Sequence, residues 1–401
     1  MAVPADERPF LTAREAAAEL NVSRATLYAY VSRGLVRSEA VPGSRARRYL
    51  AEDVRRLRAR KTPPVRDGAG DGLRGTRLLD SAITLIADGG LYYRGRDAAA
   101  LAEAATLESV AGLLWRCGER DPFALPPPRQ LPLPSLPVGI ESCQARLAVA
   151  AGDDARAYNL EPAGLARTGA RLVRLLTACF TGTPPTAEPV HLQLARAWGG
   201  DADTAELIRA ALVLCADHEL NASTFTVRVV ASTRATPYAA VLAGLAALQG
   251  PRHGGMTARV AAFCDEVAAR GDIAAAVAER LRRGDRLPGF GHPLYPGGDP
   301  RGVALQRLLA RHVAGSPQYA DLQTLAQSVD DATELKANID FALVSLQRSC
   351  GLPRQAPIAM FAVGRSVGWL AHAQEQYARP ELIRPRARYV GEQPQPAHRP
   401  G

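Results

Sequence analysis

The 401-residue sequence predicts an all-α protein, in which a small N-terminal module precedes a much larger helical region. Aromatic residues make up only 5% of a chain rich in Ala and Leu, which favours helix over sheet. Apolar residues recur at helical spacing over long segments, and few runs alternate as strands do. The charge is uneven, because residues 1–61 carry +6 of the net charge of +9. A basic excess confined to one module indicates an anionic partner for that module.

The N-terminal module has the sequence signals of a winged helix-turn-helix. Thr12 and Glu15 form a capping-box pattern, and Ser23 can cap a second helix that ends at Gly34. Ser38–Tyr49 is typical of a hairpin, or wing, with Pro-Gly at its tip. The module resembles the MerR-like and excisionase-like group, in which the second helix enters the major groove and the wing touches phosphate.

This resemblance implies DNA binding by polar and basic side chains of the second helix and the wing. The expected residues are Arg24, Thr26, Tyr28, Arg33, Arg45, Arg47 and Arg48. A role in dimerisation or protein docking stays open, because small modules of this kind serve those purposes too. Residues 62–76 are rich in Pro and Gly, and we expect them to form a linker.

The larger region begins near residue 77 and alternates between Ala/Leu-rich segments and short breaks. Ser81–Leu85 and Leu91–Tyr93 predict a short hairpin, and Pro126–Pro137 predicts an irregular surface loop. Five segments have the apolar spacing of amphipathic helices. They are 97–115, 200–215, 236–249, 256–269 and 272–283.

The composition argues against several other classes of protein. The six cysteines stand singly without a Cys-x-x-Cys pair, so we expect no disulfide framework and no metal site. Buried thiols in a reducing cytoplasm fit this pattern better. We find no secretory signal at the N-terminus and no run of about 18 apolar residues that would predict a membrane span.

Three stretches of the C-terminal half contain a set of groups suited to carbon-acid chemistry. His253 and His292 each lie beside glycines, where the backbone can approach a ligand closely, and Asp340 follows them. A carboxylate base with two imidazoles can remove a proton from carbon and polarise carbonyl groups. Each residue alone has an ordinary structural explanation, such as a helix N-cap for Asp340.

Seven ordered motifs give the larger region a family resemblance. They are Ser81–Thr84 with Gly90–Asp97, Asp217–Phe225, Gly250–Gly255, Gly289–Tyr295 with Asp299–Arg301, Asn338–Asp340, Phe361–Arg365 and Leu382–Arg386. Over about residues 77–391 the chain resembles the citrate synthases. The resemblance implies the all-α citrate synthase fold and an acyltransferase of that class, in a homodimer or higher homo-oligomer.

The resemblance also implies a division of the larger region. A large domain is expected over 77–253 and 347–401, and a smaller closing domain over 254–346. The tail from about residue 392 is expected to be disordered.

Citrate synthases condense acetyl-CoA with oxaloacetate, and the resemblance assigns roles in this reaction. Asp340 is expected to be the base, His253 to hydrogen-bond the thioester oxygen, and His292 to donate to the oxaloacetate carbonyl. No cofactor is expected, because the CoA thioester is itself a substrate.

Oxaloacetate has two carboxylates, for which bidentate arginines are suited. The resemblance places Arg301 and Arg365 in the pocket, with Arg384 reaching in from the other subunit. His218 is expected to hydrogen-bond the substrate and Phe361 to pack near it.

Some residues depart from the family pattern. Pro296 stands where many relatives have a basic residue, Met256-Thr257 replaces the usual Ala-Asn, and 116–200 fits poorly. These changes leave the choice of acyl-CoA open, so a 2-methylcitrate synthase that uses propionyl-CoA is one alternative. The other is a DNA-binding regulator, in which the synthase fold serves as metabolite sensor and dimeriser.

Overall fold

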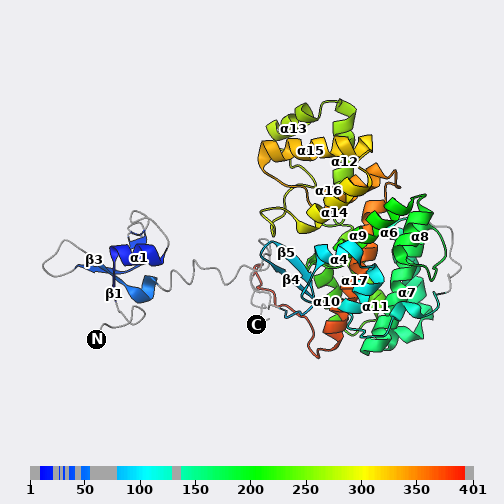
Figure 1. Cartoon of the computed structure of the whole chain (residues 1–401). Coiled ribbons are helices and arrows are strands. Elements are labelled where there is room, and N and C mark those ends of the chain that lie inside the picture. Colours follow the sequence, from blue (N-terminus) through cyan, green and yellow to red (C-terminus); the bar gives the residue numbers. More distant parts are fainter. Residues whose placement is uncertain are drawn as a thin grey trace, which may run out of the picture. The chain divides into compact units, whose positions relative to one another are not determined.

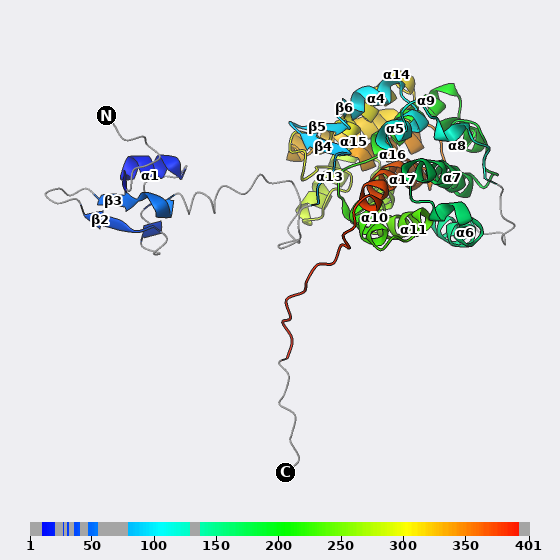
Figure 2. The same cartoon turned by 90° about the horizontal axis from the view of Figure 1, so that it is seen from below.

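The computed structural model describes residues 10–20, 27, 30–31, 36–40, 47–54, 79–128 and 137–392. The chain divides into two compact units, Met1–Arg74 and Gly75–Gly401 (Figures 1 and 2). The predicted linker over 62–76 and the tail beyond residue 392 lie outside the described residues.

The N-terminal unit contains a three-stranded antiparallel sheet in the order β1-β3-β2. Its strands are β1 (Phe10–Thr12), β2 (Ser38–Ala40) and β3 (Arg47–Leu50). The pairing of β2 with β3 confirms the two arms of the predicted wing. The sequence analysis missed β1, because three residues are too few to show alternation.

Helix α1 (Ala13–Glu19) follows β1 directly and confirms the predicted capping box. The Glu15 N–H donates to the Thr12 hydroxyl at 3.3 Å, and the Thr12 N–H donates to the Glu15 carboxylate at 2.8 Å. Of the predicted second helix, Leu27, Tyr30 and Val31 are helical, and Leu27 is fully buried in the core of the unit. The rest of that helix lies outside the described residues.

The larger unit begins with a small sheet of β4 (Thr84–Ala87), β5 (Gly90–Tyr93) and β6 (Arg96–Asp97). Asp88 and Gly89 join β4 to β5 with φ angles of +52° and +74°. A tight two-residue hairpin turn requires such left-handed angles. The predicted hairpin is therefore confirmed, although β4 starts later than expected.

Helices form nearly all the rest of the described part of this unit. They are α4 (Ala98–Ala104), α5 (Leu107–Leu114), α6 (Ile140–Asp153), α7 (Pro162–Thr181), α8 (Val190–Ala197), α9 (Ala202–Cys215), α10 (Ala222–Ser232), α11 (Pro237–Leu248), α12 (Met256–Arg270), α13 (Ile273–Arg282), α14 (Pro300–His312), α15 (Pro317–Thr333), α16 (Ile339–Ser349) and α17 (Ala356–Tyr377), with short 3₁₀ turns at Pro122–Ala124 and Ala155–Tyr158.

Four of the five predicted helical segments agree with α9, α11, α12 and α13 to within two residues. The prediction for 97–115 was wrong at one point, because the structure divides this segment into α4 and α5. Ala105 is extended, and Thr106 begins α5 with a capping box to Ser109. The apolar spacing continues across the break, so periodicity alone does not reveal it.

Helix α17 is the centre of the larger unit and packs against α7, α9, α10 and α11. It is buried along most of its length, as expected of a helix that is apolar on all sides. Gly364 and Gly368 let α9 approach closely, since a Cβ at these positions would stand 2.7 Å from the Leu212 oxygen and 2.3 Å from the Ala216 oxygen.

A second hydrophobic core lies among α12, α13, α15 and α16, apart from the main core. Figure 1 shows α12, α13 and α15 gathered in one lobe. Helix α14 packs on both α16 and α9, so it joins this lobe to the main helical body. No helix among the described residues has the length and apolarity to cross a membrane.

Candidate active site

His253 lies in the turn between α11 and α12. Its Nε2 is 2.6 Å from Ser223 Oγ, and the indole N–H of Trp369 donates to the same oxygen at 3.1 Å. Burial, together with the positive charges of Arg365 and Arg301, lowers the pKa of His253 to about 3. The imidazole is therefore neutral at pH 7 and is tied to a polar partner on α10.

His292 follows Gly291 in the loop before α14, and its protonation state follows from its surroundings. Burial and the charge of Arg301 lower its pKa to about 4, so the ring is neutral at pH 7. The Leu294 backbone N–H donates to Nδ1 at 3.2 Å. A neutral imidazole that accepts at Nδ1 carries its proton on Nε2. His292 therefore offers a single N–H donor.

His218 is buried at the turn after α9 and lies close to His292. The two rings meet edge to face with 5.3 Å between their centroids. His218 Nε2 is 3.0 Å from the hydroxyl of Tyr295, whose ring centroid is 4.9 Å from that of His292. Burial and the neighbouring arginines hold the pKa of His218 well below its usual value. This aromatic cluster thus places two neutral imidazoles side by side.

Asp340 is in the first turn of α16, but it does not cap the helix. Asn338 is the N-cap, and its side chain accepts the N–H groups of Asp340 and Phe341. Asp340 Oδ1 is buried and has no hydrogen-bond partner among the described residues. Burial raises the pKa of Asp340 to about 7, although the charge of Arg301 opposes the rise. A carboxylate with a pKa near neutrality is well matched to general-base catalysis.

Arg301 is held by a buried ion pair. Its Nε and Nη2 donate to the two carboxylate oxygens of Asp299 at 3.0 and 2.9 Å. Asp299 also caps α14 and accepts the Ile339 N–H at 3.1 Å, which connects the pair to α16. Burial lowers the pKa of Arg301, but the charge of Asp299 outweighs this effect and raises it overall. The pair uses two of the five N–H groups of the guanidinium, so both N–H groups of Nη1 and the second N–H of Nη2 remain for a ligand.

Arg365 has an N–H donor that is not used within the described part of the chain. Its Nε donates to the Cys215 carbonyl at 2.8 Å, whereas Nη2 is buried without a partner among the described residues. Its Cζ lies 5.0 Å from the centroid of the Phe361 ring, which meets the His253 ring edge on at 5.8 Å. An unpaired buried donor is costly, so a bound carboxylate would compensate it.

The charges of two arginines act on the buried histidines and on Asp340 alike. Arg301 and Arg365 both act on the pKa values of His218, His253 and Asp340. The structure thus brings together seven of the eight predicted active-site residues. They are His218, His253, His292, Arg301, Asp340, Phe361 and Arg365.

Arg384 is the residue that the described structure does not bring into this cluster. It is exposed in the extended stretch that follows α17 (Figure 2). The neighbouring Ile383 N–H donates to Ser232 Oγ at 3.1 Å, which fastens the start of this stretch to α10.

The sequence analysis missed several residues that support the site. Ser223, Tyr295 and Asp299 lie inside the quoted motifs, but their partners are distant in the chain and no spacing rule identifies them. Trp369 gave no signal, because an apolar residue in an apolar helix is expected to be core. Among the described residues, no group of His, Cys, Asp and Glu side chains could hold a metal ion.

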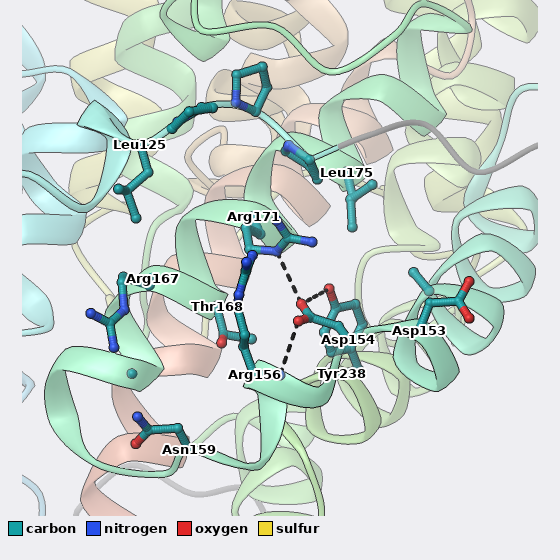
Figure 3. A pocket seen from close by; sticks show the side chains of 15 residues that line it. Leu125, Asp153, Asp154, Arg156, Asn159, Arg167, Thr168, Arg171, Leu175 and Tyr238 are labelled. Atoms are coloured by element: carbon teal, nitrogen blue, oxygen red, sulfur yellow. Dashed lines mark hydrogen bonds and ion pairs between the residues drawn. The ribbon is translucent and has the colours of Figure 1, made fainter.

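A cavity of about 800 Å³ lies elsewhere, among α6, α7 and α11 (Figure 3). Arg156, Arg167 and Arg171 line it, and Asp154 accepts hydrogen bonds there from Arg171 at 3.1 Å and Tyr238 at 2.9 Å. None of the predicted active-site residues lines this cavity. Its size therefore does not identify it as the place of the chemistry.

In the N-terminal unit, two of the predicted DNA-binding residues are described. Arg47 Nε donates to Ser38 Oγ at 2.9 Å, and Arg48 forms an ion pair with Glu39 at 3.0 Å. Both arginines are exposed on β3. The other predicted residues lie outside the described residues: Arg24, Thr26, Tyr28, Arg33 and Arg45.

Comparison with known families agrees with this arrangement. The family model of the citrate synthase C-terminal domain matches residues 149–386. The chain belongs to the citrate synthase family. It is therefore an acyltransferase of the class that converts the acyl group into an alkyl group on transfer. A helix-turn-helix domain model matches residues 10–62, which confirms the expected N-terminal module.

Known proteins resemble the citrate synthase part of the chain along nearly their full length. Citrate synthase 2 of Bacillus subtilis is 30% identical over 80% of this chain and 95% of its own length. The 2-methylcitrate synthase of Shewanella oneidensis is 29% identical over 81% of this chain and 96% of its own. A solved citrate synthase from Thermoplasma acidophilum, in ternary complex with carboxymethyl coenzyme A and oxaloacetate, is 25% identical and covers 80% of this chain and 95% of its own, with a TM-score of 0.67.

Proposed function

We propose that the chain is a citrate synthase, which joins the methyl carbon of acetyl-CoA to the ketone carbon of oxaloacetate and releases citrate and CoA. The state of Asp340 is the main observation that supports this proposal. Its Oδ1 is buried and has no hydrogen-bond partner among the described residues, its pKa is about 7, and it is electrostatically coupled to the arginines that also act on two neutral imidazoles. The ligands named for the Thermoplasma complex, carboxymethyl coenzyme A and oxaloacetate, support this choice.

In the first step, Asp340 removes a proton from the methyl carbon of the thioester. The negative charge that develops on the thioester oxygen needs a donor. We assign this donor to Nδ1–H of His253, in the tautomer whose Nε2 accepts from the Ser223 hydroxyl 2.6 Å away. That hydroxyl accepts from Trp369 and also lies 2.8 Å from Asn221 Oδ1, which competes for its proton. A neutral donor avoids placing a full charge beside a weakly basic enol oxygen.

In the second step, the enol carbon attacks the ketone carbon of oxaloacetate and a carbon–carbon bond forms. His292 donates its Nε2–H to the ketone oxygen and transfers the proton as the alcohol forms. Nη2 of Arg365 and Nη1 of Arg301 are the donors available for the substrate carboxylates. His218 hydrogen-bonds the substrate and Phe361 packs beside it.

In the third step, water cleaves the citryl thioester and the proton that Asp340 took from the methyl group is passed back to His292, so that one acetyl-CoA, one oxaloacetate and one water give citrate and CoA with both residues restored. The overall reaction balances in atoms and charge without any cofactor. We infer that the chain acts as a homodimer, because the exposed Arg384 is free to reach the site of a partner subunit. Six free cysteines favour a location in the cytoplasm. We also propose that residues 254–346 form the domain that closes over the substrates.

A 2-methylcitrate synthase is the second candidate, and the similarity to the Shewanella oneidensis enzyme favours it. One additional methylene changes binding in an apolar pocket by only about 1–3 kcal/mol, so the catalytic residues do not distinguish the two acyl groups. Release of CoA thiol, measured with acetyl-CoA and propionyl-CoA side by side, will distinguish them through kcat/KM. Wild-type protein that releases no thiol above background with oxaloacetate and either thioester would contradict both candidates.

We also propose that the N-terminal module binds duplex DNA. Its net charge of +6 and its match to the helix-turn-helix model favour an anionic partner. Affinity for duplex DNA should fall steeply with salt and vanish when residues 1–61 are removed. Binding that is absent, or that does not depend on salt, would instead leave this module with a docking role. A complete catalytic set argues against a pure sensor, which would need the arginines but not Asp340.

A further inference from the structure

A buried carboxylate that the reaction itself does not use lies directly behind the oxaloacetate residues. We propose that Asp217 is the positioning residue of this half of the site, which aims His218 and stabilises the buried guanidinium of Arg365. The inference rests on the proposed function, because it assigns these two residues to oxaloacetate.

Asp217 connects three separate parts of the fold through one oxygen. Its Oδ2 accepts from the Thr84 hydroxyl of β4 at 2.5 Å and from the Glu219 N–H at 3.1 Å. It also lies 3.2 Å from Nε2 of His372 on α17. Asp217 and His372 are both fully buried. The carboxylate therefore fixes the turn that contains His218 to β4 and to α17.

The backbone of the same turn is also held in place. The Asp217 N–H donates to the Tyr93 hydroxyl at 3.3 Å, and that hydroxyl is 3.2 Å from the Asp217 carbonyl oxygen. Gly368 has no room for a side chain, because a Cβ there would stand 2.4 Å from Asp217 Oδ1. Asp217 thus has one allowed position, and the direction of His218 follows from it.

Asp217 also provides negative charge behind Arg365. Burial lowers the pKa of Arg365, and Asp217 is the main group that opposes this effect. Oδ1 of Asp217 and Nη2 of Arg365 each lack a hydrogen-bond partner among the described residues. The negative charge at Asp217 therefore offsets part of the cost of burying the guanidinium, while Nη2 of Arg365 stays available for a substrate carboxylate.

The test compares the effect of a substitution at Asp217 on the KM for oxaloacetate with its effect on the KM for acetyl-CoA. In Asp217→Asn, the KM for oxaloacetate should rise by about 10- to 100-fold, the range found when an outer partner of a ligating residue is removed. The kcat and the KM for acetyl-CoA should change by less than about threefold, because only ground-state binding of one substrate is weakened. Isothermal calorimetry with oxaloacetate alone measures the same loss without turnover.

The hydroxyl of Thr84 provides a milder pair of variants that should fold if Asp217→Asn does not. Thr84→Val removes the hydroxyl and should raise the KM for oxaloacetate, whereas Thr84→Ser keeps it and should restore the wild-type value. Thr177→Val is the matched control, because it removes another buried hydroxyl that donates within α7, to the Val173 carbonyl at 2.9 Å. It should leave both KM values unchanged.

The possible results distinguish a positioning role of Asp217 from a purely structural one. Parallel changes in kcat, both KM values and the melting temperature would show a structural role only and would overturn it, as would equal KM values in Thr84→Val and Thr84→Ser. Wild-type protein that binds oxaloacetate but releases no thiol would contradict the proposed function. Weaker calorimetric binding in Asp217→Asn would then still support the positioning role.

Discussion

At the scale of single residues, burial determines the chemistry of the site. It lowers the pKa values of His253 and His292 to about 3 and about 4 and raises that of Asp340 to about 7. All three shifts have the same cause, because a buried environment penalises the charged form of every group. The result is a set of neutral donors and one base that ionises near the working pH.

The pH dependence of catalysis follows from these values. Only the ionised form of Asp340 can accept a proton, so kcat/KM should fall as pH decreases through about 7. His253 and His292 stay neutral down to about pH 4, so their titration does not change kcat/KM above that pH. Asp340→Asn should lower kcat by about 10²- to 10⁴-fold, the usual contribution of a general base.

Thiol-release rates between pH 5 and 9 measure this fall in kcat/KM. Asp321→Asn, which alters an exposed carboxylate on α15, serves as the control and should keep the wild-type profile. A wild-type profile that stays flat from pH 9 down to pH 5 would show that the base titrates as an ordinary carboxyl and would contradict the proposed origin of its pKa.

Asp340 should also reduce the stability of the folded chain. Its folded pKa of about 7 lies above the usual value of about 3.9. Below pH 4 the carboxyl is protonated in both the folded and the unfolded chain, and the protein incurs no penalty. Between about pH 4 and pH 7 the unfolded chain ionises this carboxyl while the folded chain keeps it protonated, so the penalty grows, and above pH 7 the penalty is complete. Asp340→Asn should therefore stabilise the protein at pH 8 by on the order of 2–4 kcal/mol.

Urea denaturation of both proteins at pH 4.5 and pH 8 measures this difference. The gain in unfolding free energy should be much smaller at the lower pH. An equal gain at both pH values would mean that the carboxylate charge is not its source.

The sequence could identify the reacting residues but not their states. The motifs contain His253, His292 and Asp340 because each lies in a local pattern of glycines and caps. The pKa of Asp340 depends on burial and on Arg301, whose own charge is held by Asp299. The pKa of Asp340 therefore depends on contacts among α14, α16 and α17, which are separate helices of the chain, so no local sequence pattern can predict it.

At the scale of elements, α17 shows why small residues matter. It contributes Phe361 and Arg365 to the site, and their position depends on how closely the helix approaches α9. Periodicity predicted most helices, because each has one apolar face to bury. The close contact between α17 and α9 was not predictable, since a glycine inside a helix more often weakens it than packs it.

Gly368→Ala tests this contact. The added Cβ would stand 2.3 Å from the Ala216 carbonyl oxygen, and neither backbone can move without displacing the core. We expect a loss of about 1–3 kcal/mol in the free energy of unfolding. Gly112→Ala in α5 is the matched control, because a Cβ there meets nothing within 4 Å. It should stabilise by about 0.5–1 kcal/mol, as Ala is favoured over Gly within a helix. Similar losses in both variants would contradict the close-contact argument.

At the scale of the whole molecule, the chain combines two units with separate cores. The helix-turn-helix module and the synthase part each match a family model of their own. Removal of residues 1–61 should therefore abolish DNA binding while thiol release persists. We propose that the stretch after α17 contacts a partner subunit, because Leu382, Tyr389 and Val390 are apolar and exposed in it.

A complementation experiment tests whether Arg384 serves the partner's site. Asp340→Asn and Arg384→Ala should each abolish most thiol release as homodimers. In a mixed dimer, the site that retains Asp340 receives Arg384 from the other chain and is complete. Random pairing makes about half of the dimers mixed, each with one complete site, so roughly a quarter of the wild-type activity should return. If Arg384 served its own chain, no mixed dimer would contain a complete site and activity would stay at the level of the two variants measured separately.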